Sequence, residues 1–335
     1  MKNVWLFFVL IGFCASAQTG EENYQQAKKL MQQGDFDKAA VAFTSAIKQL
    51  PNNNDIAKDY VYLLCLQKDY VQAIAIGKRI VEQPDADEQA YQVLGIAYKG
   101  KGEYANAEDL YLKALKKFTN SGLLYNEYGE LMALWNNLPN AIVKWEAGIE
   151  ADPNYSSNYY NAAMYYNRFD LKPLWQILYA EIFINLESYS QRTSEMKAVL
   201  LDAYKKLFTN NLLEKSIGMP KNTAFEKACY STMAKHSNVV SNNVSVDAII
   251  ALKTRFLLDW FFSKQNEVFA YRMFEQQQYL IREGMFVAYN QWMLGAANSP
   301  AAYQVWLNTH EQEATAFKQF QQGRVLKLLK GQYYQ

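Results

Sequence analysis

The chain of 335 residues is long enough for one large or two ordinary domains. Apolar residues make up 50% and aromatic residues 15%, which excludes a mainly disordered chain. The formal net charge is +1, so no basic field over the whole chain indicates nucleic acid or anionic lipid as a partner. Tyrosine is common at 25 residues, whereas 15 glycines and 7 prolines are few, which favours helices over a turn-rich β protein.

The first residues are typical of a secretory signal peptide. Lys2 precedes a short apolar run over residues 4–13, and the small-x-small triplet at 15–17 is typical of a cleavage site. The apolar run is too short to span a bilayer comfortably. We therefore expect residues 1–17 to be removed. The mature chain is then exported, to the periplasm or the exterior, and carries no transmembrane segment.

The cysteines offer two alternatives to this simple picture. Cys14 suggests a lipoprotein that is acylated after cleavage, but Phe13 stands where such sites have a small residue. Cys65 and Cys229 would remain in the mature chain, and an oxidising compartment permits a disulfide between them. They lie in different segments beside apolar helix stripes, so we expect two separate buried thiols.

A pattern with a period of 34 residues runs through the first half and is clearest over residues 91–115. Two places in the period hold mostly small residues, which are Ala27, Val61, Gly95, Gly129 and Ala163 at the first, and Ala39, Ala73, Ala107, Ala141 and then Trp175 at the second. Small side chains at both places would let two helices cross closely. Gly100 and Gly102 break the helices of one period, and Pro51 and Pro153 stop second helices.

This pattern resembles the tetratricopeptide repeat, a pair of helices with a period of 34 residues. The resemblance places repeats near residues 20, 54, 88 and 122, and a degenerate fifth repeat near 156. In the fifth, Trp175 replaces the small residue and Pro173 lies inside the expected second helix. The resemblance implies an all-α solenoid over residues 20–187, whose last unit is atypical, as terminal repeats often are.

From Thr193 the 34-residue register is no longer detectable, and residues 188–335 are expected to form a helical C-terminal domain without repeats. Residues 246–262 are apolar nearly all round, which predicts a buried helix. Residues 267–293 are expected to form either one long helix or two consecutive helices, with Gly284 as the candidate break. Helix-start signals are found at Thr223 with Glu226, at Ser299 with Pro300 and at Thr309 with Gln312.

Two short motifs suggest chemistry, and both favour a structural interpretation. Residues 100–105 match G-x-G-x-x-A, but they follow a helix, whereas a dinucleotide site needs a preceding strand. Residues 310–314 begin like a zinc-protease helix, but Ala314 replaces the second histidine and the chain holds two histidines in all. We therefore expect a protein that is not an enzyme, with no catalytic residues, no cofactor and no metal.

The resemblance implies that the first helix of each repeat lines a concave groove for a protein or peptide partner. The groove residues are then Tyr24, Lys28, Lys58, Tyr62, Gln92, Lys99, Asn126, Glu130, Tyr160, Asn167 and Arg168. Tyrosines mixed with cations and amides suit an extended segment, through stacking and adaptable hydrogen bonds. The leading prediction is an exported scaffold or adaptor that binds a protein segment and no nucleic acid.

Two alternatives stay open. One is a structural component of an envelope or secretion assembly. The other is a small-ligand-binding or enzymatic C-terminal domain, with a polar pocket made of Arg255, Asp259, Arg282, Glu283, Tyr289, Trp292 and His310. Within this set Arg255 and Asp259 are four residues apart on one helix, and they either pair structurally, which we favour, or line the site.

Overall fold

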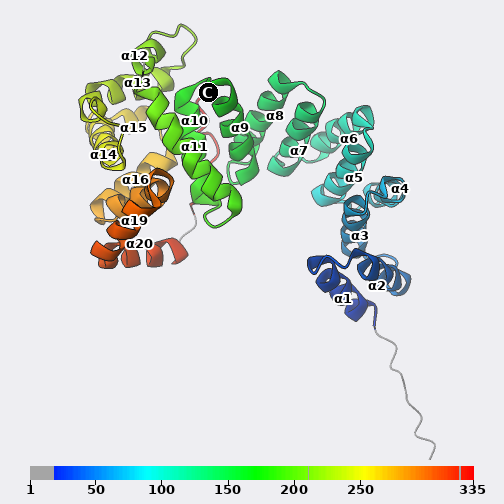
Figure 1. Cartoon of the computed structure of the whole chain (residues 1–335). Coiled ribbons are helices and arrows are strands. Elements are labelled where there is room, and N and C mark those ends of the chain that lie inside the picture. Colours follow the sequence, from blue (N-terminus) through cyan, green and yellow to red (C-terminus); the bar gives the residue numbers. More distant parts are fainter. Residues whose placement is uncertain (1–18, 210, 324–325) are drawn as a thin grey trace, which may run out of the picture. The chain divides into compact units, whose positions relative to one another are not determined.

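The computed structural model describes residues 19–209, 211–323 and 326–335. The predicted signal peptide and Cys14 lie outside the described residues, so both remain predictions. The described residues form helices and loops without a β-strand, and helical hairpins follow one another in tandem (Figure 1). This confirms the predicted all-α solenoid. In this part of the chain no helix combines the length and the apolar character that crossing a membrane requires.

The chain divides into two compact units, residues 1–107 and 108–335. The predicted domain boundary after residue 187 is a different division and stays a prediction. The first unit holds α1 (Gly20–Gln32), α2 (Phe36–Gln49), α3 (Asn54–Leu66), α4 (Tyr70–Val81), α5 (Glu88–Lys101) and the start of α6 (Tyr104–Lys117). Its first helices start at residues 20, 54 and 88, which are the predicted 34-residue steps.

Local signals start and stop these hairpins. The side chains of Asp35 and Asp69 cap α2 and α4 by accepting backbone hydrogen bonds. Gly102 ends α5 with φ of 80°, a conformation that favours glycine. A Cβ on Gly100 would lie 2.3 Å from the ring of Tyr70, so only glycine fits there. The G-x-G-x-x-A motif is therefore the turn of a helical hairpin, as predicted.

The small residues of the period lie where helices cross. Ala39, Ala73, Ala107 and Ala141 are all fully buried. In the second unit a Cβ on Gly129 would lie 2.3 Å from Nε1 of Trp145. Interiors this closely packed leave no room for an added methyl group. The physical reason given for the repeat pattern is thus confirmed in both units.

The second unit continues the array and adds irregular helices. After the rest of α6 it holds α7 (Gly122–Leu134), α8 (Leu138–Ala151), α9 (Ser156–Phe169), α10 (Pro173–Leu186), α11 (Gln191–Leu207), α12 (Leu212–Ile217), α13 (Ala224–Lys235), the 3₁₀ turn η1 (Ser237–Val240), α14 (Val246–Phe262), α15 (Gln265–Val268), α16 (Arg272–Arg282), α17 (Phe286–Asn290), the π-helical turn η2 (Gln291–Gly295), α18 (Ala296–Asn298), α19 (Pro300–Thr309) and α20 (Glu311–Gly323).

The fifth repeat is more regular than the sequence indicated. Pro173 does not lie inside the second helix but is the first residue of α10, where its missing N–H has no intrahelical partner to lose. Helix α10 begins one residue later than expected from the 34-residue period, counted from Leu138, the first residue of α8. Trp175 departs from the pattern because its side chain contacts α13, where its Nε1 donates a hydrogen bond to Glu226 at 2.8 Å.

The repeat contact also extends one helix further than predicted. In the first unit the Tyr24 hydroxyl donates to Asp59 of the next first helix at 2.7 Å. In the second unit the Tyr160 hydroxyl donates to Glu195 of α11 at 2.6 Å. Both pairs are 35 residues apart and join the fifth residue of one repeat to the sixth of the next. By this contact, α11 occupies the position that the first helix of a sixth repeat would have.

Other C-terminal predictions are confirmed in part. Gly284 separates α16 from α17 with φ of 70°, and the Thr223 capping box forms. Helix α14 has the predicted bounds, but Phe262 is 90% exposed, so the helix is not buried all round. The predicted capping box at Thr309 is wrong. Thr309 is the last residue of α19, and its hydroxyl donates to the carbonyl of Val305.

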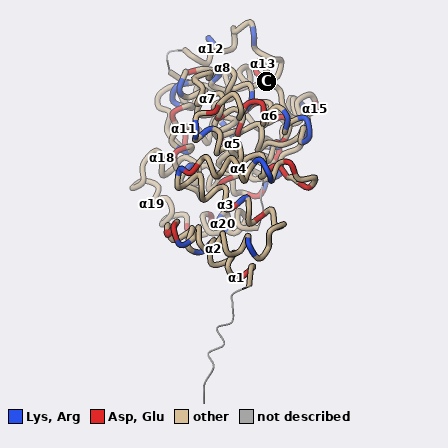
Figure 2. The backbone as a smooth tube through the Cα atoms, turned by 90° about the vertical axis from the view of Figure 1, so that its right-hand side faces the viewer, with Lys and Arg blue, Asp and Glu red and all other residues tan. Residues whose placement is uncertain are grey.

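Charged residues of both signs are interspersed over the helices of each unit (Figure 2). This agrees with the near-neutral net charge. Cys65 and Cys229 are buried free thiols, as predicted. Burial raises the pKa of the Cys65 thiol to about 11, and it raises the pKa of Cys229 as well. Both thiols are therefore protonated and unreactive near neutral pH.

A polar network is buried in the second unit. Lys253 of α14 donates to Oε1 of Glu181 in α10 at 2.5 Å, and their side chains are 6% and 2% exposed. Oε2 of Glu181 accepts from Gln277 of α16 at 2.7 Å, and Oε1 also accepts from the Tyr204 hydroxyl of α11 at 3.2 Å. One carboxylate thus joins four helices.

The C-terminal residues 326–335 return to the helices of the second unit, and the chain ends beside α10 (Figure 1). The backbone of Leu328 exchanges two hydrogen bonds with the side chain of Asn154, at 2.9 and 3.1 Å. The ring of Tyr334 stacks on Phe225 of α13 with 4.8 Å between centroids. The last side chain, Gln335, accepts from the Tyr179 hydroxyl of α10 at 2.5 Å.

Candidate functional site

In the first unit, side chains link the first helices of successive repeats. Tyr24 of α1 reaches Asp59 of α3, and Nζ of Lys28 lies 4.3 Å from the centre of the Tyr24 ring. Nζ of Lys58 on α3 lies 3.4 Å from Oε1 of Gln89 on α5. Three predicted groove residues therefore lie on one continuous set of helices.

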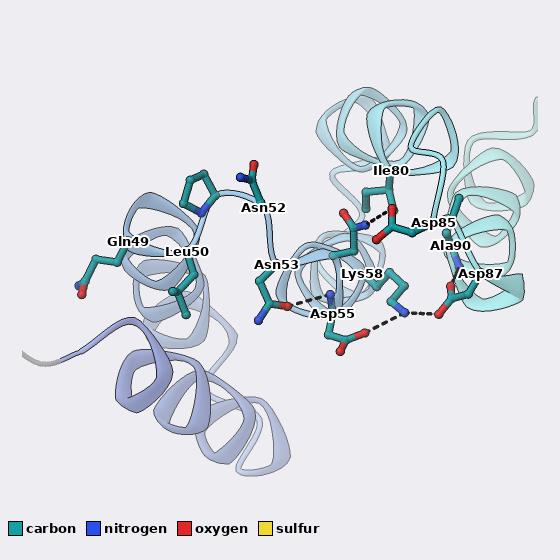
Figure 3. Close-up of a pocket in the computed structure, with 13 residues that line it drawn as sticks. Gln49, Leu50, Asn52, Asn53, Asp55, Lys58, Ile80, Asp85, Asp87 and Ala90 are labelled. Carbon is teal, nitrogen blue, oxygen red and sulfur yellow. Dashed lines mark hydrogen bonds and ion pairs between the residues drawn. The ribbon is translucent and has the colours of Figure 1, made fainter.

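A polar pocket of about 590 Å³ adjoins this surface at Lys58 (Figure 3). The loop from α2 to α3 forms one side and the loop from α4 to α5 forms the other. The residues that line it are Gln49, Leu50, Pro51, Asn52, Asn53, Asn54, Asp55, Lys58, Ile80, Asp85, Ala86, Asp87 and Ala90. Its volume is in the range of ligand pockets.

Lys58 is the centre of charge in this pocket. Its amino group lies 2.9 Å from Asp55 and 2.5 Å from Asp87, and its side chain is 8% exposed (Figure 3). Burial alone would lower the pKa of Lys58, but the hydrogen bonds to both carboxylates raise it above its usual value. Asp87 also accepts from the N–H of Ala90 at 2.9 Å and so caps α5. Lys58 is thus a neutralised cation rather than an open one.

The pocket offers acceptors more than donors. Three aspartates, Asp55, Asp85 and Asp87, line the pocket together with one lysine. Asp85 accepts from Asn54 at 3.1 Å, and Asn53 caps α3 by accepting from two backbone N–H groups. Carboxylates at these places can accept hydrogen bonds from the backbone of an extended segment or from a cationic side chain.

The decrease in the free energy of unfolding at acid pH should depend in part on Asp87. Burial alone would raise its pKa, but the hydrogen bonds from Lys58 and the Ala90 N–H hold the pKa below its usual value. The resulting stabilisation is present above about pH 4 and is lost as the pH falls through the folded pKa. We expect Asp87→Asn to lower the free energy of unfolding by about 1 kcal/mol at pH 7, since the carboxylate is half exposed.

Urea unfolding at pH 7 and pH 3 checks this expectation. The difference between the wild type and Asp87→Asn should shrink at pH 3, because the unfolded wild-type chain then takes up a proton at Asp87 and unfolding is favoured. Asp85→Asn is the matched control, since Asp85 lines the same pocket and hydrogen-bonds to an amide. An equal loss in both variants at pH 7 would contradict the role given to the Lys58–Asp87 pair.

The remaining predicted residues of the first unit differ in exposure. Tyr62 of α3 is 42% exposed and is the most open aromatic residue of the predicted set in this unit. Gln92 and Lys99 of α5 are half-buried. Tyr62 therefore offers a ring to a partner, whereas its neighbours on α5 are partly covered.

In the second unit the predicted groove residues are bonded to one another and to the next helix. Asn126 donates to Glu130 at 3.0 Å and accepts from Asn161 at 2.9 Å. Arg192 lies 5.0 Å from the centre of the Tyr160 ring. Burial and the hydrogen bond to Glu195 raise the pKa of Tyr160 to about 12. Most polar groups of this surface already have partners within the unit.

The last two predicted groove residues lie at the end of α9. Asn167 is half-buried and accepts from Gln176 at 3.0 Å. Arg168 is exposed, with its guanidinium 5.5 Å from the centre of the Phe169 ring. Arg168 is therefore more accessible to a partner than Asn167 is.

The structure does not bring the seven residues of the alternative C-terminal pocket together. Asp259 pairs with Lys235 and with Nε2 of His236, both at 3.2 Å, so the predicted pair with Arg255 does not form. Lys235 is the last residue of α13 and His236 follows it, and both contact Asp259, while Arg255 is exposed and has no ion pair in the described part of the chain.

Of the other five members, Tyr289 and Trp292 are neighbours with ring centroids 6.3 Å apart, and these five also do not form one polar pocket. Arg282 and Glu283 are exposed at the end of α16, and Tyr289 is fully buried with its hydroxyl accepting from Asn185. His310 is exposed and stacks on Trp306. Trp292 lines a pocket that is apolar rather than polar. Among the residues described, no group of three or more His, Cys, Asp or Glu is placed to hold a metal ion.

The aspartates around Lys58 were not named among the groove residues. Asp85 and Asp87 precede the first helix of their repeat, and Asp55 is the second residue of α3, on the predicted groove face. A signal for them exists. Asp87 stands just before the repeat start at residue 88, the usual place for a capping residue. A lysine at the fifth position of one repeat, such as Lys58, can reach the capping residue of the next repeat, because the first helices of successive repeats are neighbours.

Tandem helical hairpins in 34-residue steps define an α-solenoid of helix-pair repeats. Residues 30–96 match the sequence model of the family described as "Tetratricopeptide repeat". The chain therefore contains tetratricopeptide repeats, which confirms the resemblance seen in the sequence. Such a fold indicates a scaffold for protein–protein interaction, and proteins of this kind are generally not enzymes.

Several solved structures are similar to the chain. A thermophilic tetratricopeptide repeat protein of Thermus thermophilus is 16% identical with a TM-score of 0.46, over 55% of this chain and 100% of that one. A tetratricopeptide repeat protein of Parabacteroides merdae is 14% identical with a TM-score of 0.40, over 74% and 93%. PilF of Pseudomonas aeruginosa is 12% identical with a TM-score of 0.45, over 62% and 94%. No curated protein matches the sequence.

Proposed function

We propose that the protein is an exported, non-enzymatic adaptor that binds an extended protein segment on the first helices of its repeats. Its exported state is suggested by the signal-peptide pattern of residues 1–17. The observation that carries the binding proposal is the surface of the first unit, where the acceptor-rich pocket at Lys58 adjoins the exposed ring of Tyr62.

The two parts of this surface suit different groups of one extended segment. Carboxylates and amides of the pocket accept hydrogen bonds from backbone N–H groups, which gives affinity without reading sequence. Tyr62 lies one helical turn from Lys58 on the same helix, and its ring contacts an apolar side chain of the segment at little entropic cost. The excess of aspartate favours a segment with a basic residue.

Site-specific photo-cross-linking in the native cell tests this proposal. A benzophenone amino acid replaces Tyr62, and the matched control replaces Val71, which is 68% exposed but lies on the second helix α4. We expect a discrete adduct from position 62 that is absent from position 71. Asp55→Asn together with Asp87→Asn should weaken the adduct at least about threefold, if two hydrogen-bonding charges contribute.

The same sample tests export. Mass spectrometry of the cross-linked chain should find Gln18 at its N-terminus. A chain that keeps residue 1 would contradict export and leave the groove proposal standing. Equal adducts at positions 62 and 71, or none at 62, would contradict the groove proposal.

A further inference from the structure

An aromatic pocket lies in the second unit, apart from the repeat surface. Its volume is about 410 Å³, and α19, α20 and the π-helical turn η2 supply most of its wall. Five aromatic side chains line it, which are Tyr189, Trp292, Tyr303, Trp306 and Phe317. Pockets for small molecules have this size, with mainly apolar walls and few polar groups.

The π-helical turn supplies Trp292 to the wall of the pocket. Turns of this kind are rare and often occur at functional sites. Residues 291–295 form the turn and present Trp292 to the pocket. The turn ends at Gly295, where a Cβ would lie 2.5 Å from Cδ2 of Tyr303. Glycine at this place lets the Tyr303 ring pack directly on the turn, which builds one corner of the wall.

Trp292 is held in place from behind. Nζ of Lys197 lies 4.1 Å from the centre of the Trp292 ring and donates to the Trp292 carbonyl at 2.8 Å. The Phe317 ring lies 5.8 Å from the Trp292 ring. Lys197 comes from α11 and Phe317 from α20, so two distant helices fix the orientation of this ring before any ligand arrives.

The rings of Tyr303 and Trp306 on α19 and of His310 just after it have nearly parallel planes. Tyr303 and Trp306 have an interplanar angle of 4° with centroids 6.5 Å apart, and Trp306 and His310 have an angle of 7° at 4.9 Å. On the far side, Tyr189 is 74% exposed and its hydroxyl donates to Gln321 at 3.1 Å. Parallel aromatic planes favour a flat ring, which can stack on them or meet them edge to face.

The polar groups of the wall indicate an uncharged ligand. Glu311 and Lys318 line the pocket with opposite charges, and Thr315 and Gln321 are neutral. The residues that line the pocket thus carry no net charge, since Lys197 contacts Trp292 but is not itself a lining residue. Moving an ion from water against aromatic walls is unfavourable. Neutral groups that donate or accept a hydrogen bond are accommodated by the polar members.

We propose that this pocket binds a flat, uncharged aromatic ring, carried either by a free small molecule or by the side chain of a peptide. The proposal is independent of the segment bound by the repeats. A free small molecule and a peptide side chain would present the same ring to the pocket. They differ in the groups that are attached to this ring.

Isothermal titration with indole derivatives tests the proposal on the mature protein. Indole represents the free molecule and N-acetyl-tryptophanamide represents the side chain. We expect one of them to bind with a Kd below about 1 mM, and tryptamine and indole-3-acetate, which are charged, to bind at least about tenfold more weakly. Tighter binding of N-acetyl-tryptophanamide than of indole would assign the pocket to a peptide.

Two tryptophan substitutions on α20 form a matched pair. Ala314 lines the pocket, so Ala314→Trp fills it and should weaken binding at least about tenfold. Ala316 is exposed on the same helix outside the pocket, so Ala316→Trp should leave the Kd within about twofold. Trp306→Ala removes part of the wall without overfilling it and should weaken binding even if Ala314→Trp does not fold. The proposal is overturned if neither neutral probe binds, if the charged probes bind equally well, or if Ala314→Trp and Ala316→Trp behave alike.

Discussion

Substitution of Lys253 by methionine is expected to lower the free energy of unfolding of the second unit by about 3–5 kcal/mol. The substitution leaves the Glu181 carboxylate without a cation at a place where its side chain is 2% exposed. Gln277 and Tyr204 still donate to it, but two neutral donors do not replace a buried counter-charge. Since Glu181 joins α10, α11, α14 and α16, the loss should reach all four helices.

A second variant separates the charge from the packing. In Lys253→Met with Glu181→Gln, no buried charge remains, and an amide oxygen can still accept from Gln277. We expect this double variant to regain most of the lost stability. The matched control is Lys235→Met, the same change in an exposed ion pair with Asp259, which should cost less than about 1 kcal/mol.

Urea unfolding measures the free energies, and hydrogen exchange of peptides from residues 173–282 shows where the loss occurs. Faster exchange in α10, α14 and α16 of Lys253→Met is expected, with recovery in the double variant. The expected mechanism is wrong if Lys253→Met resembles Lys235→Met, or if the double variant is as unstable as the single one.

The repeat region could be predicted closely because its contacts are local and recur. Ala39, Ala73 and Ala107 occupy the same position in successive repeats, and each is fully buried where helices cross. Counting residues along the sequence therefore predicts where the helices pack. Helix starts at residues 20, 54, 88, 122 and 156 follow from that count. The later start of α10 was missed because the count was kept at 34 residues, although Pro173 is typical of a first helical position.

The candidate sites were less predictable because their partners come from elsewhere in the chain. Lys58 was expected to be an open groove cation, but Asp87, 29 residues later, neutralises it. Asp259 was paired with Arg255 on its own helix, whereas Lys235 at the end of α13 forms the ion pair with it. Trp292 was placed in a polar pocket, and neither the π-helical turn nor the approach of Tyr189 has a signal in a helical periodicity.

Removal of residues 326–335 is expected to destabilise the second unit, although this segment forms no helix. Leu326 and Leu328 are 4% and 8% exposed, and the Tyr334 ring stacks on Phe225. Burial of two leucines together with one aromatic contact gives an upper estimate of about 4 to 7 kcal/mol. The same deletion uncovers Trp175 and Tyr179, which line the space beside the segment.

Neighbouring leucines provide a matched pair of single substitutions. Leu328→Ala should cost about 2 kcal/mol or more, since it removes buried methyl groups. Leu329 is 54% exposed, so Leu329→Ala should cost less than about 0.5 kcal/mol. Both variants keep the backbone hydrogen bonds to Asn154, and any difference between them reports side-chain burial.

The contacts of this segment predict where the deletion acts. Leu328 bonds to Asn154, 174 residues earlier, between the fourth and fifth repeats, while Tyr334 contacts α13. The segment thus connects repeat helices with the irregular helices that follow them. Deletion should speed hydrogen exchange in α9, α10 and α13 and leave peptides of the first unit unchanged. An unchanged urea midpoint with unchanged exchange in α10 would show that the segment covers these helices without stabilising them.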